Sequence, residues 1–433
     1  YQYVRRFYDG DHYNSPMDGE ERKTMVNYCR KVVDKGVDWF LANGIYFKAP
    51  AGNEQIAEYL ETVWNGNGRP LLLQRGIRHG ILNGDSFYYV TVRTEENGVK
   101  LPPEKFYLVL NSVDPAYCFP LWSPSNPTEM SAALVQYPIV RNKESALYSL
   151  YITPTSFTTF INRERKGQQL NPFGLVNLVH VPNMSRSVGV FGESDLTDII
   201  PLNQEYNRVA YSLRKIIRYH GEPTTLIFGA RLTTMEKSAE TVWSNLPIDA
   251  RVENLELRGD MGVIREYLKD TKARICEIAE IPSIAFDPSG QPISNTSGLA
   301  MQLLYQPLEA KTRRRRPSFT QAMRQLNKLI LLGAEKILGE NVAILADFPE
   351  RRYETEPVFT SALPKDEQIE LDLGVKRMAS GIWSQAEALR RLSDVEDQER
   401  LTIELAADAR YKLAQQAEIQ KANNGRPPEL SSV

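Results

Sequence analysis

Two long amphipathic segments, separated by a β-rich insertion, dominate the pattern of apolar and polar positions along this chain. Apolar side chains recur at spacings of three and four in residues 199–220, at Ile199, Leu202, Tyr206, Val209, Leu213 and Ile216. Residues 261–281 repeat this pattern with Ile264, Leu268, Thr271, Ile275 and Ile278. Such spacing puts one apolar stripe along each helix. The sequence therefore predicts a helical hairpin whose far end, residues 222–257, holds two strands (224–228 and 252–257) and a short helix (235–243).

Helices and then strands precede this hairpin. Wide apolar faces predict helices over residues 20–42, 54–64 and 71–80. β-branched and aromatic residues predict an antiparallel run of strands over residues 86–94, 106–113, 132–140, 146–152 and 156–161, which residues 173–180 close. We therefore expect an α+β fold that is mainly helical, with a β-rich segment before the hairpin.

Helical patterns return after the hairpin. Residues 297–338 predict a bent helix or two segments, because Pro307 and Pro317 interrupt the pattern. A strand is predicted over residues 341–347, and charged helices are predicted over residues 366–380, 384–391 and 397–418. The polar tail, residues 421–433, is expected to be disordered.

Composition limits the classes of function. The chain has 433 residues, 42% of them hydrophobic, which suits a globular protein of two to four domains. Its net charge of −2 argues against a protein that coats nucleic acid with a basic surface. Because acids are as abundant as bases, we expect the run Arg313–Arg316 to form ion pairs rather than a DNA site.

Cysteine content and hydropathy bear on the compartment. Three scattered cysteines without CxxC spacing favour a reducing compartment, and no apolar run reaches the ~20 residues that a membrane span needs. We therefore expect no membrane association. The chain starts with Tyr1 rather than Met, so we expect a trimmed N-terminus.

Signatures of common enzymes are absent from the sequence. It contains no GxxxxGK[ST], HExxH or GxSxG, and no GxGxxG after a strand. The four histidines lie far apart, as structural histidines do: His12, His79, His180 and His220. We expect no catalytic residue, cofactor or metal. Two other functions stay open, a nuclease-like enzyme built from dispersed carboxylates and a structural adaptor through which no DNA passes.

Several motifs occur together in the order and spacing of one family. The strongest are Gly192-Glu193-Ser194-Asp195-Leu196 with Glu205-Tyr206-Asn207, Ile281-Pro282-Ser283-Ile284-Ala285-Phe286, and Pro364-Lys365-Asp366 with Gly381-Ile382-Trp383-Ser384. Asn83-Gly84-Asp85 and Tyr8-Asp9-Gly10-Asp11-His12 accompany them. Through these motifs the chain resembles the portal proteins, or head-to-tail connectors, of long-tailed bacteriophages.

This resemblance implies a non-enzymatic virion protein that is assembled in the host cytoplasm. It implies a ring, usually of twelve copies, at one capsid vertex, through which double-stranded DNA is packaged and ejected. The implied partners are the terminase large subunit and the capsid, scaffold and head-completion proteins.

The resemblance also implies a division of the chain. A wing would comprise residues 1–192 and 298–362, and the stem helices residues 193–221 and 259–281. Residues 222–258 would be the clip, 282–297 the tunnel loop, 363–418 the crown, and 419–433 a disordered tail.

Site residues follow from this division. The tunnel loop would use Ile284, Phe286, Asp287, Ile293 and Asn295, with Ile284, Phe286 or Ile293 as an apolar constriction. The stem would face DNA with Lys215, Arg218, Arg265 and Lys269, and the clip would dock partners with Glu236, Lys237 and Trp243.

Overall fold

The computed structural model describes residues 1–12, 24–42, 44–96, 99–102, 105–141, 143–186, 188–221, 224–228, 249–255, 261–286, 298–339, 349–360, 362 and 367–381. The chain divides into two compact units, Tyr1–Ala362 and Leu363–Val433. In the second unit the described helix is α10 (Glu367–Ala379). Among the described residues, no helix has both the length and the apolar character that crossing a membrane requires.

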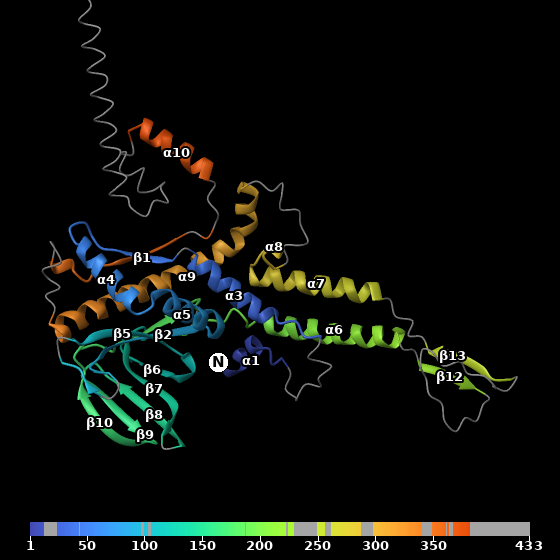
Figure 1. The fold of residues 1–433 in the computed structure, drawn as a ribbon, viewed down its shortest axis with the longest axis horizontal. Helices are drawn as coiled ribbons and strands as arrows, with labels where there is room; N and C mark the ends of the chain where they lie inside the picture. The colour runs from blue at the N-terminus through green and yellow to red at the C-terminus, as the bar shows by residue number, and fades with distance from the viewer. Residues whose placement is uncertain are drawn as a thin grey trace, which may run out of the picture. The chain divides into compact units, whose positions relative to one another are not determined.

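Helices form the core of the first unit (Figure 1). They are α1 (Gln2–Asp9), α3 (Tyr28–Leu41), α4 (Glu54–Gly66), α5 (Arg69–Asn83) and the long α9 (Gly298–Gly333), which a π-helical turn, Ala334–Leu338, extends. Buried side chains such as Phe40, Trp64 and Phe319 join α3, α4 and α9 in one cluster. The Trp64 indole also donates to Asn327 Oδ1 at 2.9 Å, so α4 is fixed to α9 by a buried hydrogen bond as well as by packing.

Two antiparallel sheets adjoin this helical core. The three-stranded sheet has the order β11–β2–β5, from Leu178–Pro182, Asp85–Arg93 and Tyr107–Val113. The five-stranded sheet has the order β10–β9–β8–β7–β6, from Glu164–Leu170, Ser156–Ile161, Glu144–Ile152, Met130–Arg141 and Cys118–Trp122. Phe87, Ala133, Val135 and Ile152 pack in a second core that joins the two sheets. The single run of strands expected from the sequence is therefore divided between two sheets.

Short elements complete the unit. β1 (Ile45–Lys48) pairs with β14 (Glu356–Phe359), and β3 (Glu95–Glu96) pairs with β4 (Val99–Lys100). Single 3-10 turns lie at Pro115–Tyr117 and Pro349–Arg351.

Several expected boundaries differ from those observed. α3 begins at Tyr28, not near residue 20, because the Asn27 side chain accepts from the Arg30 amide at 2.9 Å and caps the helix. The strand expected over residues 173–180 is Leu178–Pro182. Within the expected range 297–338, residues 298–338 form a bent helix, and Figure 1 shows the bend near the N-terminal end of α9. The strand expected at 341–347 and the helices expected at 235–243, 384–391 and 397–418 lie outside the described residues.

A close approach between α5 and β2 depends on glycine. A Cβ built on Gly76 would lie 1.9 Å from the hydroxyl of Tyr88, whose side chain is fully buried. Contacts under 3.0 Å force something to move, and Tyr88 is enclosed by the core. Gly76 therefore sets the distance between α5 and the three-stranded sheet.

We predict that Gly76→Ala destabilises the protein by about 1–3 kcal/mol through overpacking, despite the better helix propensity of alanine. Gly66→Ala is the matched control, because Gly66 is also helical and nothing lies within 4 Å of its added Cβ. Urea unfolding of both variants measures the effect. Equal midpoints for the two variants would show that α5 and β2 can separate at no cost.

Candidate functional site

The expected helical hairpin is present. α6 (Ile199–Gly221) and α7 (Met261–Ala279) pack side by side (Figure 1). β12 (Thr224–Phe228) pairs antiparallel with β13 (Arg251–Leu255) between them in the chain. These bounds confirm the two helices and the two strands that the sequence pattern predicted.

α7 carries three different faces. At about 100° of rotation per residue, these faces are adjacent sectors, and the exposed acids Glu266, Asp270 and Glu277 lie outside them. The first face is buried or half-buried and contains Ile264, Leu268, Thr271, Ile275 and Ala279. The second is exposed and mostly apolar, with Val263 at 65%, Tyr267 at 41% and Ile278 at 45% of full exposure and Arg274 among them. The third is basic and exposed and contains Arg265 and Lys269. A helix that packs only against its own chain needs apolar side chains on its buried face alone.

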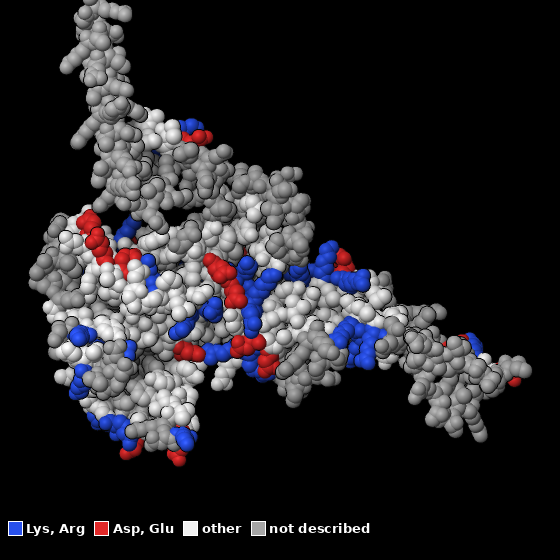
Figure 2. Space-filling view, viewed as in Figure 1, with Lys and Arg blue, Asp and Glu red and all other residues white. Residues whose placement is uncertain are grey.

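The expected basic residues of the hairpin are at the surface. Lys215 and Arg218 are exposed on α6, and Arg265 and Lys269 are exposed on α7. Lys269 lies 3.4 Å from Glu266, a surface pair that holds little energy. Lys215 Nζ lies 4.5 Å from the centre of the Tyr211 ring. Figure 2 shows Lys and Arg side chains gathered over the part of the molecule that α6 and α7 occupy.

Two residues expected in an exposed apolar constriction are buried instead. Ile284 and Phe286 belong to a short helix, α8 (Ser283–Phe286), and both lie in the interior. Phe286 packs on Tyr28 with ring centres 6.0 Å apart, and Lys31 donates to its carbonyl oxygen. Neither side chain is exposed within the single chain, and α3 supplies part of the surface that covers Phe286.

Six other expected site residues lie outside the described residues. They are Asp287, Ile293 and Asn295 of the loop, and Glu236, Lys237 and Trp243 of the insertion.

The base of the hairpin is a joint between two of the motifs. A Cβ on Gly192 would lie 2.2 Å from the carbonyl oxygen of Gly84, so the two backbones touch. Gly84 also has φ of +90°, which favours glycine. The Gly192 amide donates to Asp85 Oδ1 at 2.9 Å, and Ser194 Oγ donates to the Leu82 carbonyl at 2.6 Å. The entry to α6 is thus held to the turn between α5 and β2.

A buried charge cluster lies at the same joint. Asp195 is ion-paired with Lys311 at 2.8 Å and with Arg315, and all three side chains are almost fully buried. Lys311 also donates to the carbonyl of Ala279 at 2.9 Å, at the end of α7. Burial alone would raise the pKa of Asp195, but the charges of Arg315 and Lys311, with hydrogen bonds from Lys311 and Asn183, lower it to about 2. One lysine of α9 therefore contacts the bases of both hairpin helices.

The basic run on α9 forms ion pairs within the chain, as expected. Besides the Arg315 pair with Asp195, Arg314 pairs with Glu280, and Arg316 lies 3.4 Å from Glu309. Arg313 is exposed.

Two buried asparagines on α6 complete the joint. Asn203 Oδ1 accepts from the Cys29 amide at 3.1 Å, and Asn207 Oδ1 accepts from the Val26 amide at 2.9 Å. Asn207 Nδ2 also lies 3.0 Å from His12 Nδ1. The sequence analysis missed this role, although polar residues four apart beside an apolar helix stripe were a usable signal.

The three cysteines and His79 are types of side chain that can react, but burial shifts the pKa of each one away from neutral pH. Cys29, Cys118 and Cys276 are buried, and burial raises the pKa of each, that of Cys29 to about 12. Burial also lowers the pKa of His79 to about 4. Within the described ranges, no group of three or more His, Cys, Asp or Glu side chains could hold a metal ion.

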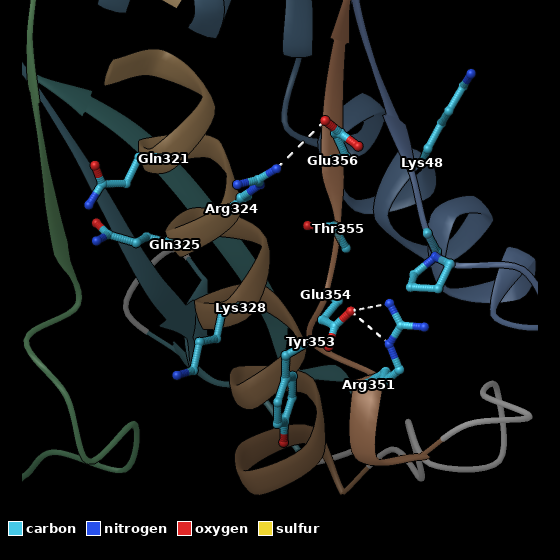
Figure 3. Close-up of a pocket in the computed structure, with 12 residues that line it drawn as sticks. Lys48, Gln321, Arg324, Gln325, Lys328, Arg351, Tyr353, Glu354, Thr355 and Glu356 are labelled. Atoms are coloured by element: carbon cyan, nitrogen blue, oxygen red, sulfur yellow. Dashed lines mark hydrogen bonds and ion pairs between the residues drawn. The ribbon is translucent and has the colours of Figure 1, made fainter. Parts of the chain in front are cut away.

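One hollow lacks the residue types of a catalytic constellation in its described lining. It has a volume of about 710 Å³ and lies between α9, β14 and the chain before α4 (Figure 3). Its described lining has no serine, cysteine or histidine. Arg351 pairs with Glu354 at 2.7 Å, and Arg324 lies 3.6 Å from Glu356. Each of these carboxylates is already engaged by an arginine.

These features define a protein of mixed α+β fold with a helical hairpin anchored to its core. The chain belongs to the family described as phage portal protein, SPP1 Gp6-like, which matches residues 1–424. It is therefore a non-enzymatic virion component, and the nuclease-like alternative is wrong. A search of curated proteins found no match. A chain in the solved virion of a native gene transfer agent (GTA) particle is similar, with 13% identity and a TM-score of 0.46 over 90% of this chain and 98% of that one.

We predict that Asp195→Asn destabilises the protein by about 3–5 kcal/mol, because it leaves two buried cations without their anion. Urea unfolding at neutral pH measures the loss. Glu266→Gln, which breaks the exposed pair with Lys269, is the control and should cost less than about 1 kcal/mol. Similar losses in both variants would contradict the proposed importance of the buried cluster.

A pH dependence follows from the same group. The pKa of Asp195 is lower in the folded chain than its usual 3.8, so protonation favours the unfolded state. Its contribution, about 2 kcal/mol, is fully present above pH ~4 and is lost as the pH falls towards ~2. We therefore expect the stability difference between wild type and Asp195→Asn to shrink over this range. A difference that stayed constant from pH 7 to pH 2.5 would mean that Asp195 does not titrate there.

Proposed function

We propose that copies of this chain form a closed ring around a channel for double-stranded DNA, with α6 and α7 as the wall of the channel. The three faces of α7 carry this proposal. A helix in the wall of a tube needs one face for its own chain, one for the neighbouring copy and one for the lumen. The buried face, the exposed stripe of Val263, Tyr267 and Ile278, and the basic face with Arg265 and Lys269 match these needs.

The charge distribution supports non-specific passage of DNA. Lysine and arginine contacts to phosphate carry no sequence information, so the exposed Lys215, Arg218, Arg265 and Lys269 suit a duplex that slides. The net charge of −2 avoids a bulk basic surface that would hold DNA tightly.

The other regions take the roles that the family suggests. In this proposal, residues 1–192 and 298–362 form the wing and residues 363–418 the crown. The clip, residues 222–258, docks the terminase large subunit through Glu236, Lys237 and Trp243. The tunnel loop narrows the channel with Asp287, Ile293 and Asn295, while Ile284 and Phe286 anchor its first turn. Capsid, scaffold and head-completion proteins contact the ring.

The alternative is a capsid adaptor through which no DNA passes. Electron microscopy of the purified full chain separates the two functions. A closed ring with an axial hole wide enough for a duplex supports the channel. A ring without a hole, or a monomer under every condition, contradicts it.

We predict that changing Lys215, Arg218, Arg265 and Lys269 together to Gln leaves ring formation unchanged and weakens DNA binding by the rings. The slope of log affinity against log salt should become shallower, because that slope scales with the number of phosphate contacts. DNA packaging should fall at least about threefold if these contacts guide the duplex.

The matched control replaces four exposed basic residues of the five-stranded sheet and its loops with Gln: Lys143, Arg163, Arg165 and Lys166. This control removes the same number of positive charges, but from elements other than α6 and α7. Equal loss of salt dependence in both variants would place DNA binding elsewhere on the ring.

A further inference from the structure

A small hollow lies between α3, α8 and the N-terminal part of α9. Its volume is about 390 Å³. Seven apolar residues line it, Trp39, Ala42, Ile284, Ala285, Tyr305, Leu308 and Ala362, together with the charged Lys35 and Asp38. Trp39 and Tyr305 form one wall, with ring centres 4.8 Å apart and planes within 3° of parallel. The hollow has the size and apolar character to accept an aliphatic side chain.

The aromatic wall is held in place before anything binds. The Trp39 indole donates to Glu309 Oε2 at 3.3 Å, and Arg316 lies 3.4 Å from the other oxygen of Glu309. Arg316 also stacks over Phe359, 5.7 Å from the ring centre. A rigid wall loses little conformational freedom on binding, so contact with it is favoured.

An exposed apolar ridge lies on a different face of the same helix. Leu303 is 62% exposed, and Pro307, one turn further on, is also exposed. Proline has no N–H, so α9 provides no donor for the carbonyl of Leu303. A lone exposed leucine is ordinary, but here an apolar ridge and an interrupted helical hydrogen bond coincide.

The ridge and the hollow face away from each other. Leu303 and Tyr305 are two residues apart on α9, which separates them by about 200° around the helix axis. A ring is built from heterologous contacts, in which one surface of each copy meets a different surface of the next. A protrusion and a hollow on opposite faces of one helix meet that requirement, whereas a two-fold dimer would not need it.

We propose that Leu303 and Pro307 of one copy insert into the hollow beside the Trp39–Tyr305 wall of the next copy. The partner is a second copy of this chain, and the inference rests on the proposed ring. α9 then lies between neighbours, with its hollow filled on one side and its ridge buried on the other.

Cysteine cross-linking tests the contact directly. The full-length double variant Leu303→Cys with Ala285→Cys is oxidised with copper phenanthroline and run on a denaturing gel without reductant. The native cysteines are buried, so the new pair alone should react. We expect a ladder that extends to the complete ring, and no ladder from either single variant. Dimers alone, or no cross-link in assembled rings, would overturn the proposal.

Assembly measurements provide an independent readout. Leu303→Asp and Trp39→Ala should each raise the protein concentration for half-maximal ring formation at least tenfold. Leu71→Asp is the matched control, since Leu71 is 61% exposed on α5 and should shift that concentration less than twofold. Circular dichroism checks that each variant is folded.

The outcomes separate this contact from the proposed function. If rings form normally with Leu303→Asp and the double-cysteine variant yields no ladder, the contact is wrong and the channel proposal still stands. A wild-type chain that never forms rings removes both.

Discussion

The carboxylate of Asp195 imposes the strictest physical constraint on this protein. A charge removed from water is tolerated only with partners of opposite sign at close range. Lys311 and Arg315 supply two, and both belong to α9. Because Asp195 lies four residues before the start of α6 and Lys311 also binds the last turn of α7, this electrostatic requirement fixes the ends of both hairpin helices to α9. The hairpin is therefore joined to the core by charge as well as by apolar packing.

Sequence patterns predicted individual helices and strands better than they predicted which elements pack or pair with each other. The spacing along residues 199–220 and 261–281 predicted both hairpin helices, since an apolar stripe directly reflects local periodicity. The same reasoning missed β10, whose residues are all exposed and show no alternation, and β1, which pairs with a strand over three hundred residues away. Register between distant strands depends on tertiary packing, which local periodicity does not encode.

The candidate site shows the same limit. Lys215, Arg218, Arg265 and Lys269 were correctly predicted to be exposed, because polar residues opposite an apolar stripe face away from the core. Ile284 and Phe286 lie in a Pro/Gly/Ser-rich stretch that resembles an exposed loop, yet both are buried, and Phe286 packs on Tyr28 of α3. The sequence shows that a residue is apolar, but the fold decides whether that residue is exposed to water or buried against another helix. The partners of Arg315 and Lys311, more than a hundred residues away, were hidden for the same reason.

The bond from Lys311 to the carbonyl of Ala279 has a mechanical consequence. A hydrogen bond weakens steeply once its angle departs from linearity, so α7 cannot slide along α9 without losing the bond from Lys311, and the ion pair to Asp195 opposes the same movement near the start of α6. A force on either hairpin helix is therefore transmitted to α9 through these side chains. The hairpin is anchored to the core at one joint, where the backbones of Gly84 and Gly192 also touch.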